Sequence, residues 1–316
     1  MNSVQSNLTS LLIFTIFFIF SGCDTPEGPV PISDTVPEAE GWAIEPLLTG
    51  LEQPWSMVWL PGGDMLITER PGRLIRVNAE SMTTTDISGV PEVYSDGQGG
   101  LLDISLHPKF TENSLVYLTY STGDENVNRT TVGRGRLEGN TLTGFEEIFR
   151  VSPDKEGNQH FGSRMEWMSD STFVLSVGDG GNRPLETAGI LSREHAQLLD
   201  SHLGKILRLN EDGSAASGNP FTEEPGVAPE IWSYGHRNIQ GLAIDPETGN
   251  LWSNEHGSRG GDELNLIHKG ANYGWPEATY SREYWYTRIS SETSIPGMED
   301  PKLVWTPSQA PSGLMF

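Results

Sequence analysis

Residues 55–78 read WSMVWLPGGDMLITERPGRLIRVN, and their pattern decides the fold. Two short apolar runs are joined at Pro61-Gly62-Gly63-Asp64, and a third run follows Pro71-Gly72. Short apolar runs separated by Pro, Gly and Asp are typical of antiparallel strands joined by tight turns. The rest of the chain beyond residue 41 has little helical periodicity. The stretch therefore predicts a sheet made of consecutive hairpins.

The same pattern returns in three further stretches: LLDISLHPKFTENSLVYLTYS (101–121), MEWMSDSTFVLSVGDGG (165–181) and QGLAIDPETGNLWSNEHG (240–257). The four units begin near Trp55, Leu101, Met165 and Gly241, roughly 45 to 75 residues apart. A period of about 40 to 50 residues with insertions is the signature of propeller blades, each of three or four antiparallel strands. We expect residues 198–214 to complete the third blade, after a short helical turn at 193–199. The alternative, a β-sandwich, would favour shorter and more even strand spacing.

Composition limits the class of protein. The chain has 316 residues with 36 Gly and 21 Pro, which agrees with many tight turns in one large all-β domain. Its 43 acidic and 20 basic residues give a net charge of −23, which argues against nucleic acid as a partner. Such a charge fits a solvated protein that binds a neutral or cationic small molecule.

The first forty residues are expected to direct export. The apolar run LLIFTIFFIF (11–20) is too short to span a bilayer but fits the core of a signal peptide. Ser21-Gly22-Cys23 follows, which resembles a bacterial lipobox, so we expect residues 1–23 to be a lipoprotein signal and Cys23 to be lipidated. Phe20 stands where Leu is usual and residues 1–10 lack Lys and Arg, so an ordinary signal peptide remains the alternative. The protein would then be periplasmic or on the cell surface.

Cys23 is the only cysteine, so no intrachain disulfide is expected. Residues 24–40 are rich in proline and acids and predict an extended tether, which places the folded domain at 41–316. The chain ends in WTPSQAPSGLMF (305–316), which we expect to begin an inner strand, with a fifth blade under way between Tyr273 and Phe316. A propeller closes by pairing its last strand with its first, so the sequence is expected to be truncated at its C-terminal end.

Polar clusters occupy equivalent places in successive units. Gln98, Gln159-His160 and His236-Arg237-Asn238 each lie just before an inner strand, and EHGSRGGDELN (255–265) follows the second strand of the last unit. Each cluster alone is more simply a turn or a surface ion pair. Because loops at the inner strands gather at one end of a propeller channel, the four together predict one common pocket.

Five motifs of the chain resemble the soluble glucose and aldose sugar dehydrogenases that use pyrroloquinoline quinone, in the glucose/sorbosone dehydrogenase family. They are, in order, GQGGLLD (97–103), HRNIQGLAID (236–245), EHGSRGGDELN (255–265), GANYGWP (270–276) and APSG (310–313). The resemblance implies a six-bladed propeller that oxidises aldoses at C1 to the lactone. It also implies that a Lys and an Arg pair that grip the quinone carboxylates lie beyond Phe316.

The resemblance assigns roles to residues of this chain. His160 corresponds to the general base, for which a group neutral near pH 7 is suited. Arg237 corresponds to the cation that stabilises negative charge on the quinone oxygens. Gln98 corresponds to a residue beside substrate and quinone, and Asn238 to a cofactor contact. Gln159 and Asp179 are the remaining candidates for substrate contact.

The resemblance also implies two Ca²⁺ sites. The carbonyls of Gly257 and Ser258 correspond to ligands of the ion that polarises the quinone, and Glu263 and Tyr273 to ligands of a structural ion, with Asp262 beside them. Gln159 replaces an Asp of the glucose enzymes, Ser258 a Pro and His256 a Gln, which favours the broader aldose dehydrogenases.

Two other functions stay open at this stage. One is a calcium-dependent lactonase on a similar propeller, and the other is a binding propeller without catalysis. The sequence does not identify the sugar or the electron acceptor, and it leaves open whether the protein forms a homodimer.

Overall fold

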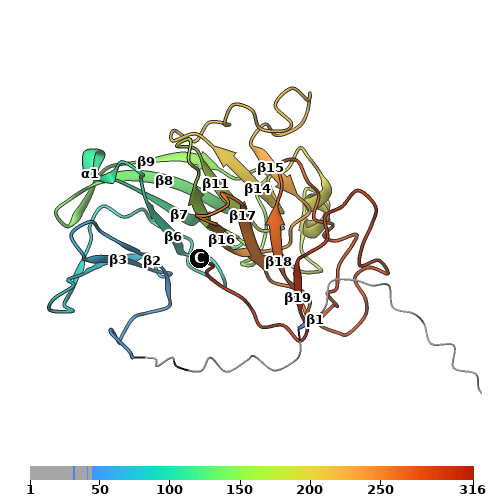
Figure 1. Ribbon diagram of the computed structural model, residues 1–316, viewed down its shortest axis with the longest axis horizontal. Helices are drawn as coiled ribbons and strands as arrows, with labels where there is room; N and C mark the ends of the chain where they lie inside the picture. Colours follow the sequence, from blue (N-terminus) through green and yellow to red (C-terminus); the bar gives the residue numbers. More distant parts are fainter. Residues whose placement is uncertain (1–30, 33–40, 42–44) are drawn as a thin grey trace, which may run out of the picture.

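The computed structural model describes residues 31–32, 41 and 45–316. Its regular elements are almost all strands, and most of these form four sheets that follow one another along an arc (Figure 1). The predicted signal peptide and Cys23 lie outside the described residues, as does most of the predicted tether. Within the part of the chain that is described, no helix is long and apolar enough to span a bilayer.

Each of the four sheets contains four antiparallel strands in chain order. The first contains β2 (Pro54–Trp59), β3 (Met65–Glu69), β4 (Arg73–Val77) and β5 (Thr84–Asp86). The second contains β6 (Leu101–Leu106), β7 (Leu115–Gly123), β8 (Asn128–Glu138) and β9 (Thr141–Arg150). The third contains β10 (Met165–Trp167), β11 (Phe173–Val177), β14 (Lys205–Leu209) and β15 (Ile231–Tyr234). The fourth contains β16 (Ile239–Ile244), β17 (Leu251–Glu255), β18 (Asp262–Ile267) and β19 (Leu303–Trp305).

Four smaller elements and one edge strand complete the description. Between β6 and β7 lies helix α1 (Phe110–Asn113). The hairpin β12 (Glu186–Thr187) and β13 (Ile190–Leu191) and the 3₁₀ helix η1 (Ser192–Gln197) lie between β11 and β14. The helix η1 confirms the predicted helical turn. At the outer edge of the fourth sheet, β1 (Pro31–Ile32) pairs in parallel with β19.

The turn between β2 and β3 shows why the opening stretch forms a hairpin. The N–H of Leu60 donates to the carbonyl of Asp64 at 2.7 Å, and that of Gly63 to the carbonyl of Leu60 at 2.8 Å. Gly63 has a φ of +92°, which glycine adopts without steric cost. The residues of β3 are all buried, as expected for a strand packed on both faces.

Apolar layers between neighbouring sheets hold the arc together. Leu66, Leu74, Ile104 and Val116 share a core between the first two sheets. A second core, which includes Tyr117, Phe173 and Leu207, joins the second and third sheets. A third core, which includes Val174, Ile206 and Leu242, joins the third and fourth sheets. The inner strands β2, β6, β10 and β16 contact one another in that order. This propeller-like arrangement confirms the predicted all-β class and the four predicted blade starts.

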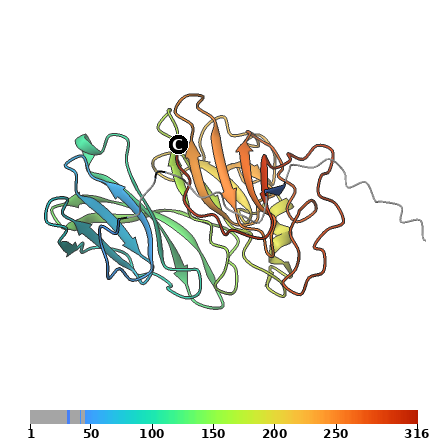
Figure 2. The same ribbon diagram turned by 60° about the horizontal axis from the view of Figure 1, so that its bottom comes forward.

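One expectation about the end of the chain is wrong. Residues 273–316 contain a single strand, β19, and it pairs with β18 as the outer strand of the fourth sheet. It does so because the long loop after β18 returns the chain to the edge of β18 that faces away from β17. The segment 306–316 contains no strand and runs back toward the centre of the arc (Figures 1 and 2). Within the described residues there are four blades, so the six-bladed count stays a prediction.

Candidate functional site

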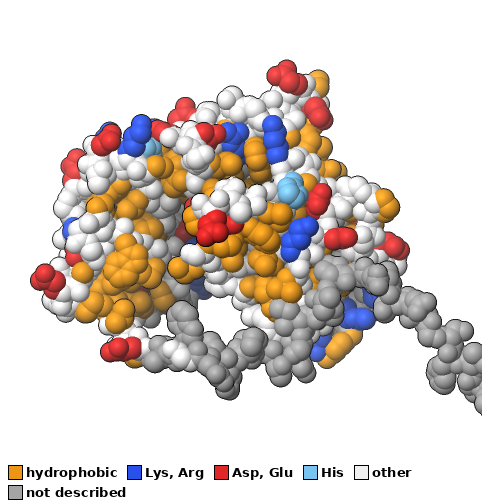
Figure 3. All heavy atoms as spheres, viewed as in Figure 1, with side chains coloured by type: hydrophobic (Ala, Val, Ile, Leu, Met, Phe, Trp, Pro, Cys, Tyr) orange, Lys and Arg blue, Asp and Glu red, His pale blue; other side chains and the backbone are white. Residues whose placement is uncertain are grey.

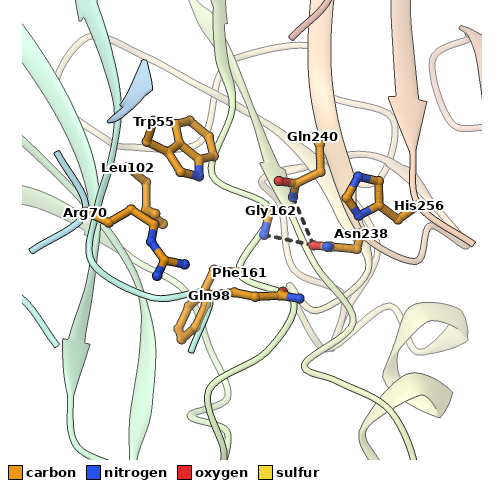
Figure 4. Close-up of a pocket in the computed structure, with 9 residues that line it drawn as sticks. All are labelled: Trp55, Arg70, Gln98, Leu102, Phe161, Gly162, Asn238, Gln240 and His256. Atoms are coloured by element: carbon orange, nitrogen blue, oxygen red, sulfur yellow. Dashed lines mark hydrogen bonds between the residues drawn. The ribbon is translucent and has the colours of Figure 1, made fainter. Parts of the chain in front are cut away.

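The predicted clusters meet at one end of the inner strands. Gln98 precedes β6, His160 precedes β10, Asn238 precedes β16 and His256 follows β17. Three of them, Gln98, Asn238 and His256, line a cavity of about 160 Å³, and His160 directly precedes another lining residue, Phe161. Figure 4 shows the cavity with the side chains that line it. Its lining residues are Trp55, Arg70, Gln98, Leu102, Phe161, Gly162, Asn238, Gln240 and His256. The loops of different blades therefore form one pocket, as the repeat pattern predicts.

His160 and Asp179 form a buried pair next to this pocket. Their side chains are 3% and 0% exposed, and His160 Nδ1 lies 2.6 Å from Asp179 Oδ1. An ionised carboxylate only accepts hydrogen bonds, so Nδ1 carries the proton and Nε2 keeps its lone pair. Burial lowers the pKa of His160; the Asp179 carboxylate opposes that shift and the Arg237 guanidinium adds to it. The imidazole is therefore neutral at pH 7 and is able to accept a proton at Nε2.

Asp179 accepts its other hydrogen bonds from groups inside the protein. Its Oδ1 also accepts from the N–H of Gly181 at 3.0 Å, and its Oδ2 accepts from Trp275 Nε1 at 2.8 Å. With no exposed surface, this carboxylate fixes the tautomer and orientation of His160 rather than facing the cavity. Our expectation of substrate contact by Asp179 gains no support from this placement.

The backbone of His160 has an unusual conformation that its neighbours impose. Its φ is +49°, and its N–H donates to Gln98 Oε1 at 2.8 Å. A Cβ added at Gly178 would lie 2.1 Å from the carbonyl oxygen of His160 and 2.9 Å from Asn238 Oδ1. Gly178 is therefore required for the loop to pack this closely. Gln98, predicted beside the substrate, thus also orients the predicted base.

Arg237 approaches the reactive side of His160. Its Nη1 donates to the carbonyls of His256 at 2.8 Å and Gly257 at 2.9 Å. Its Nη2 lies 3.4 Å from His160 Nε2, and the guanidinium lies 5.4 Å from the centre of the Trp275 ring. Its Nε is buried without a partner among the described residues. The predicted cation and the predicted base are thus side by side.

Asn182 is a member of the site that sequence reasoning missed. Its Oδ1 accepts from Arg237 Nη2 at 2.8 Å, and its Nδ2 lies 2.9 Å from Gln159 Oε1 and 3.3 Å from His160 Nε2. One amide therefore links base, cation and the predicted substrate contact Gln159. In the stretch GDGGNRPLE (178–186) the sequence predicts a site residue at Asp179 and not at Asn182, since an Asn in a glycine-rich turn is ordinary.

Lys155 is a second missed residue. It is 3% exposed, its Nζ lies 3.8 Å from the centre of the Phe161 ring, and it donates to the carbonyl of Gly157 at 3.2 Å. Its side chain also packs against Gly180, next to Asp179. Burial lowers the pKa of Lys155 to about 7, against the attraction of Asp179. A titrating amine thus lies behind the His160–Asp179 pair.

Asn238 presents a free donor to the cavity. Its Oδ1 accepts from the N–H of Gly162 at 3.2 Å and from Gln240 Nε2 at 3.3 Å. This leaves the Nδ2 group without an acceptor in the described structure, and Figure 4 shows the side chain at the cavity wall. Such a donor is suited to a carbonyl or carboxylate oxygen of a ligand.

The predicted carbonyl ligands lie beside this donor set. Gly257 and Ser258 are buried, and Ser258 Oγ has no hydrogen-bond partner in the described part of the chain. The carbonyl of Gly257 already accepts from Arg237 and has one lone pair to offer. Oxygen donors of this kind fit a hard cation such as Ca²⁺. Ser258 Oγ, which has no partner among the described residues, adds an unused oxygen donor next to these carbonyls.

The predicted structural calcium ligands have a different setting. Glu263 lies opposite Glu255 in the β17–β18 ladder, and burial followed by the charge of Glu255 raises its pKa well above the usual range. The ring of Tyr273 stacks on His236 at 4.6 Å, and its hydroxyl donates to the carbonyl of Leu266. The described residues contain no group of three or more His, Cys, Asp or Glu side chains arranged to hold a metal. A site there would need main-chain oxygens in addition to Glu263.

Comparison with known proteins gives one family. The model of the "Glucose / Sorbosone dehydrogenase" family matches residues 51–316. Aldose sugar dehydrogenase YliI of Escherichia coli is 40% identical over 279 residues, covering 86% of this chain and 72% of that protein. Quinoprotein glucose dehydrogenase B of Acinetobacter calcoaceticus is 33% identical over 257 residues, covering 76% of this chain and 53% of that protein.

Solved structures agree with these relatives. The apo form of the soluble aldose sugar dehydrogenase of E. coli superposes with a TM-score of 0.78 at 40% identity, covering 83% of this chain and 75% of that chain. The aldose sugar dehydrogenase of Streptomyces coelicolor in its form with pyrroloquinoline quinone (PQQ) bound gives a TM-score of 0.70 at 34% identity, covering 86% of this chain and 74% of that chain.

Proposed function

The chain belongs to the glucose/sorbosone dehydrogenase family, and on this premise we propose that it is a PQQ-dependent dehydrogenase that oxidises aldose sugars at C1 to the lactone. The observation that carries the proposal is the unprotonated Nε2 of His160, which has the amide of Asn182 and the guanidinium of Arg237 as neighbours. This atom belongs to a buried imidazole that Asp179 orients, and it lies beside the Arg237 guanidinium. A base beside an electrophilic cation suits an oxidation in which an alcohol loses its hydroxyl proton and a hydride from the carbon that carries the hydroxyl.

His160 acts as the general base in this proposal. The anomeric hydroxyl loses its proton to Nε2, the C1–H bond breaks with its electron pair, and C1 becomes the lactone carbonyl carbon. When bound, PQQ supplies the carbonyl carbon that accepts the hydride. Asp179 stabilises the imidazolium that forms, because its Oδ1 already accepts the Nδ1 proton. General base catalysis of this kind contributes typically about 10²- to 10⁴-fold.

Arg237 and Asn238 bind the oxygen atoms on which negative charge grows. The guanidinium keeps its charge at every working pH and two carbonyls fix its orientation, so it needs no rearrangement during the reaction. The Nδ2 group of Asn238 has two N–H groups, of which one offers a second donor here. The carbonyls of Gly257 and Ser258 would hold a Ca²⁺ ion next to these donors, and the main chain at Tyr273 together with Glu263 would hold a structural one.

We further propose that the whole protein is a closed six-bladed propeller. Residues 1–23 direct its export, with a lipid anchor at Cys23, and the reduced quinone passes its electrons to an acceptor. The E. coli relative and the quinone-bound S. coelicolor structure support the reaction class. The net charge of −23 agrees with an exported, solvated protein.

Dye reduction after loading with PQQ and Ca²⁺ tests the proposal. We expect the protein to reduce an artificial acceptor with several aldoses, and a His160→Ala variant to lose at least about 10²-fold in kcat. His202→Ala is a matched control, since His202 is also a buried histidine paired with a carboxylate, Glu230, but does not line the cavity. A folded protein that binds quinone and Ca²⁺ without reducing dye would favour a binding propeller. Lactone hydrolysis without dye reduction would favour the lactonase.

A further inference from the structure

The cavity has a charge opposite to that of the protein around it. Of 316 residues 43 are acidic, yet the nine described residues that line the cavity include Arg70 and no Asp or Glu. Figure 3 shows acidic side chains scattered over the face in view, as expected for a solvated acidic protein. A positive cavity in a negative protein focuses the field on a ligand that carries negative charge.

Arg70 has no carboxylate partner within the described structure. Its Nε lies 3.0 Å and its Nη2 2.5 Å from Gln53 Oε1, and its Nη1 donates to the carbonyl of Gly97. All three contacts use neutral oxygens, and two of the five N–H groups remain free. By contrast Arg73, three residues along, lies 2.7 Å from Glu69 Oε2. The charge of Arg70 is therefore available to a ligand.

Arg70 is also rigidly attached to the loop that carries Gln98. The N–H of Leu101 donates to the carbonyl of Arg70 at 2.9 Å. Gly100 has a φ of +139°, and a Cβ there would lie 2.1 Å from the same carbonyl oxygen. The guanidinium points into the cavity in Figure 4. A cation held in this way needs little further ordering when a ligand binds.

The neighbouring amides add donors of the same kind. Gln98 Oε1 accepts the N–H of His160, and Asn238 Oδ1 accepts two N–H groups, so both side chains direct an NH₂ group to the ligand. A cation and two amide donors match the two oxygen atoms of a carboxylate.

We propose that Arg70, with the amides of Gln98 and Asn238, forms a carboxylate-binding subsite in this cavity. This inference rests on the proposed function, in which PQQ and a sugar bind at the site that this cavity belongs to. The carboxylate comes from one of two sources: the quinone, which carries carboxylates, or an acidic sugar of the uronic acid class. Arg70 would then be a binding residue contributed by the first blade.

Binding measurements separate the subsite from catalysis. PQQ affinity is measured by quenching of tryptophan fluorescence, and galacturonate affinity by the rise in melting temperature, in Arg70→Gln and in the matched control Arg73→Gln. If the quinone is the source, we expect Arg70→Gln to weaken PQQ binding about tenfold or more, with a smaller salt dependence, and Arg73→Gln to leave it unchanged. If the sugar is the source, galacturonate binding weakens and that of galactose does not.

Two outcomes would overturn the subsite. One is unchanged affinity for both carboxylates in Arg70→Gln; the other is an equal loss of affinity for galactose and galacturonate, which would mean that the substitution only displaced the loop. If an Arg70→Lys variant retains most of the affinity for the carboxylate, then the positive charge at this position carries the binding, and the contact with Gln53 does not. Because none of these readouts needs turnover, loss of the proposed oxidation with intact carboxylate binding would contradict the proposed function alone.

Discussion

His160 Nδ1 donates a hydrogen bond to Asp179 Oδ1 across 2.6 Å, and neither side chain is more than 3% exposed. Asp179 in turn accepts from Trp275 on the loop that follows the fourth sheet's β18. The state of the base thus depends on residues of two sheets and on the main chain of Gly181.

Replacing Asp179 with Asn tests this pair. The amide keeps the shape but loses the charge, and its Nδ2 can donate to His160, which would move the imidazole proton to Nε2. We expect kcat for aldose oxidation to fall by about 10²- to 10⁴-fold, as for the corresponding change in catalytic triads. NMR of ¹⁵N-labelled histidine would report the tautomer directly. A variant with kcat within threefold of the parent would remove Asp179 from the mechanism.

Asn182 is expected to matter through the contact of Arg237 with His160. Removing its amide in Asn182→Ala frees Arg237 Nη2 and leaves Gln159 Oε1 with only the main-chain N–H of residue 182 as a donor. We expect kcat to fall about tenfold with KM nearly unchanged, because loss of a hydrogen bond to a charged group costs about 1.5 kcal/mol or more. Asn210→Ala, on a surface turn where Asn210 bonds to Ser214, is the control. Equal effects of the two substitutions would contradict this role.

Lys155 predicts a pH dependence of stability. Its pKa is lowered to about 7 in the folded protein, whereas in the unfolded chain it returns to about 10.5. Between these values the unfolded state binds more protons, so this group makes the free energy of unfolding rise with pH, by at most about 1.4 kcal/mol per pH unit. The stability that the neutral amine allows is fully present above about pH 10.5, falls as the pH is lowered, and is lost once the pH has fallen through 7.

A Lys155→Met variant should lack this slope. Urea unfolding at several pH values from 7 to 9 would show the parent gaining stability relative to the variant. The same substitution removes a positive charge that lowers the pKa of His160, so an NMR titration should give a higher pKa for His160 in the variant. Parallel stability curves together with an unshifted His160 would mean that Lys155 is a solvated amine.

Gly178 is predicted to be irreplaceable for steric reasons alone. Its φ is outside the left-handed region, but an added Cβ would meet the carbonyl oxygen of His160 at 2.1 Å. We expect Gly178→Ala to lower the free energy of unfolding by about 1–3 kcal/mol, as other overpacked positions do, and to displace the base. Gly62→Ala, where a Cβ meets nothing within 4 Å, should be neutral. A stable and active Gly178→Ala protein would show that the loop relaxes freely.

The sequence predicts the repeated part of this fold well. Trp55, Leu101 and Met165 lie in or begin the first strands of their sheets, because apolar alternation and turn residues are local signals. Strand β19 escaped prediction because it pairs with β18 across a loop of more than thirty residues, and no local pattern records that pairing. The same holds for Asn182 and Lys155, whose roles depend on contacts with distant loops.

The site shows the same division. Motif order brings Gln98, His160 and Arg237 together, since each precedes or follows an inner strand. The orientation of Asp179 does not follow from sequence, because a carboxylate in a glycine-rich turn could face either the cavity or the interior. Burial and the Trp275 contact decide for the interior.

Single-turnover reduction of bound quinone tests the central claim most directly. The protein loaded with PQQ and Ca²⁺ is mixed without oxygen with an aldose, or with the same aldose carrying deuterium at C1, and quinone absorbance is followed in the parent and in His160→Gln. We predict rapid reduction, several-fold slower with the deuterated sugar, and reduction at least about 10²-fold slower in the variant. Quinone reduction that is insensitive to deuterium at C1, or that proceeds equally fast without His160, would contradict the assignment of His160 as the base for oxidation at C1.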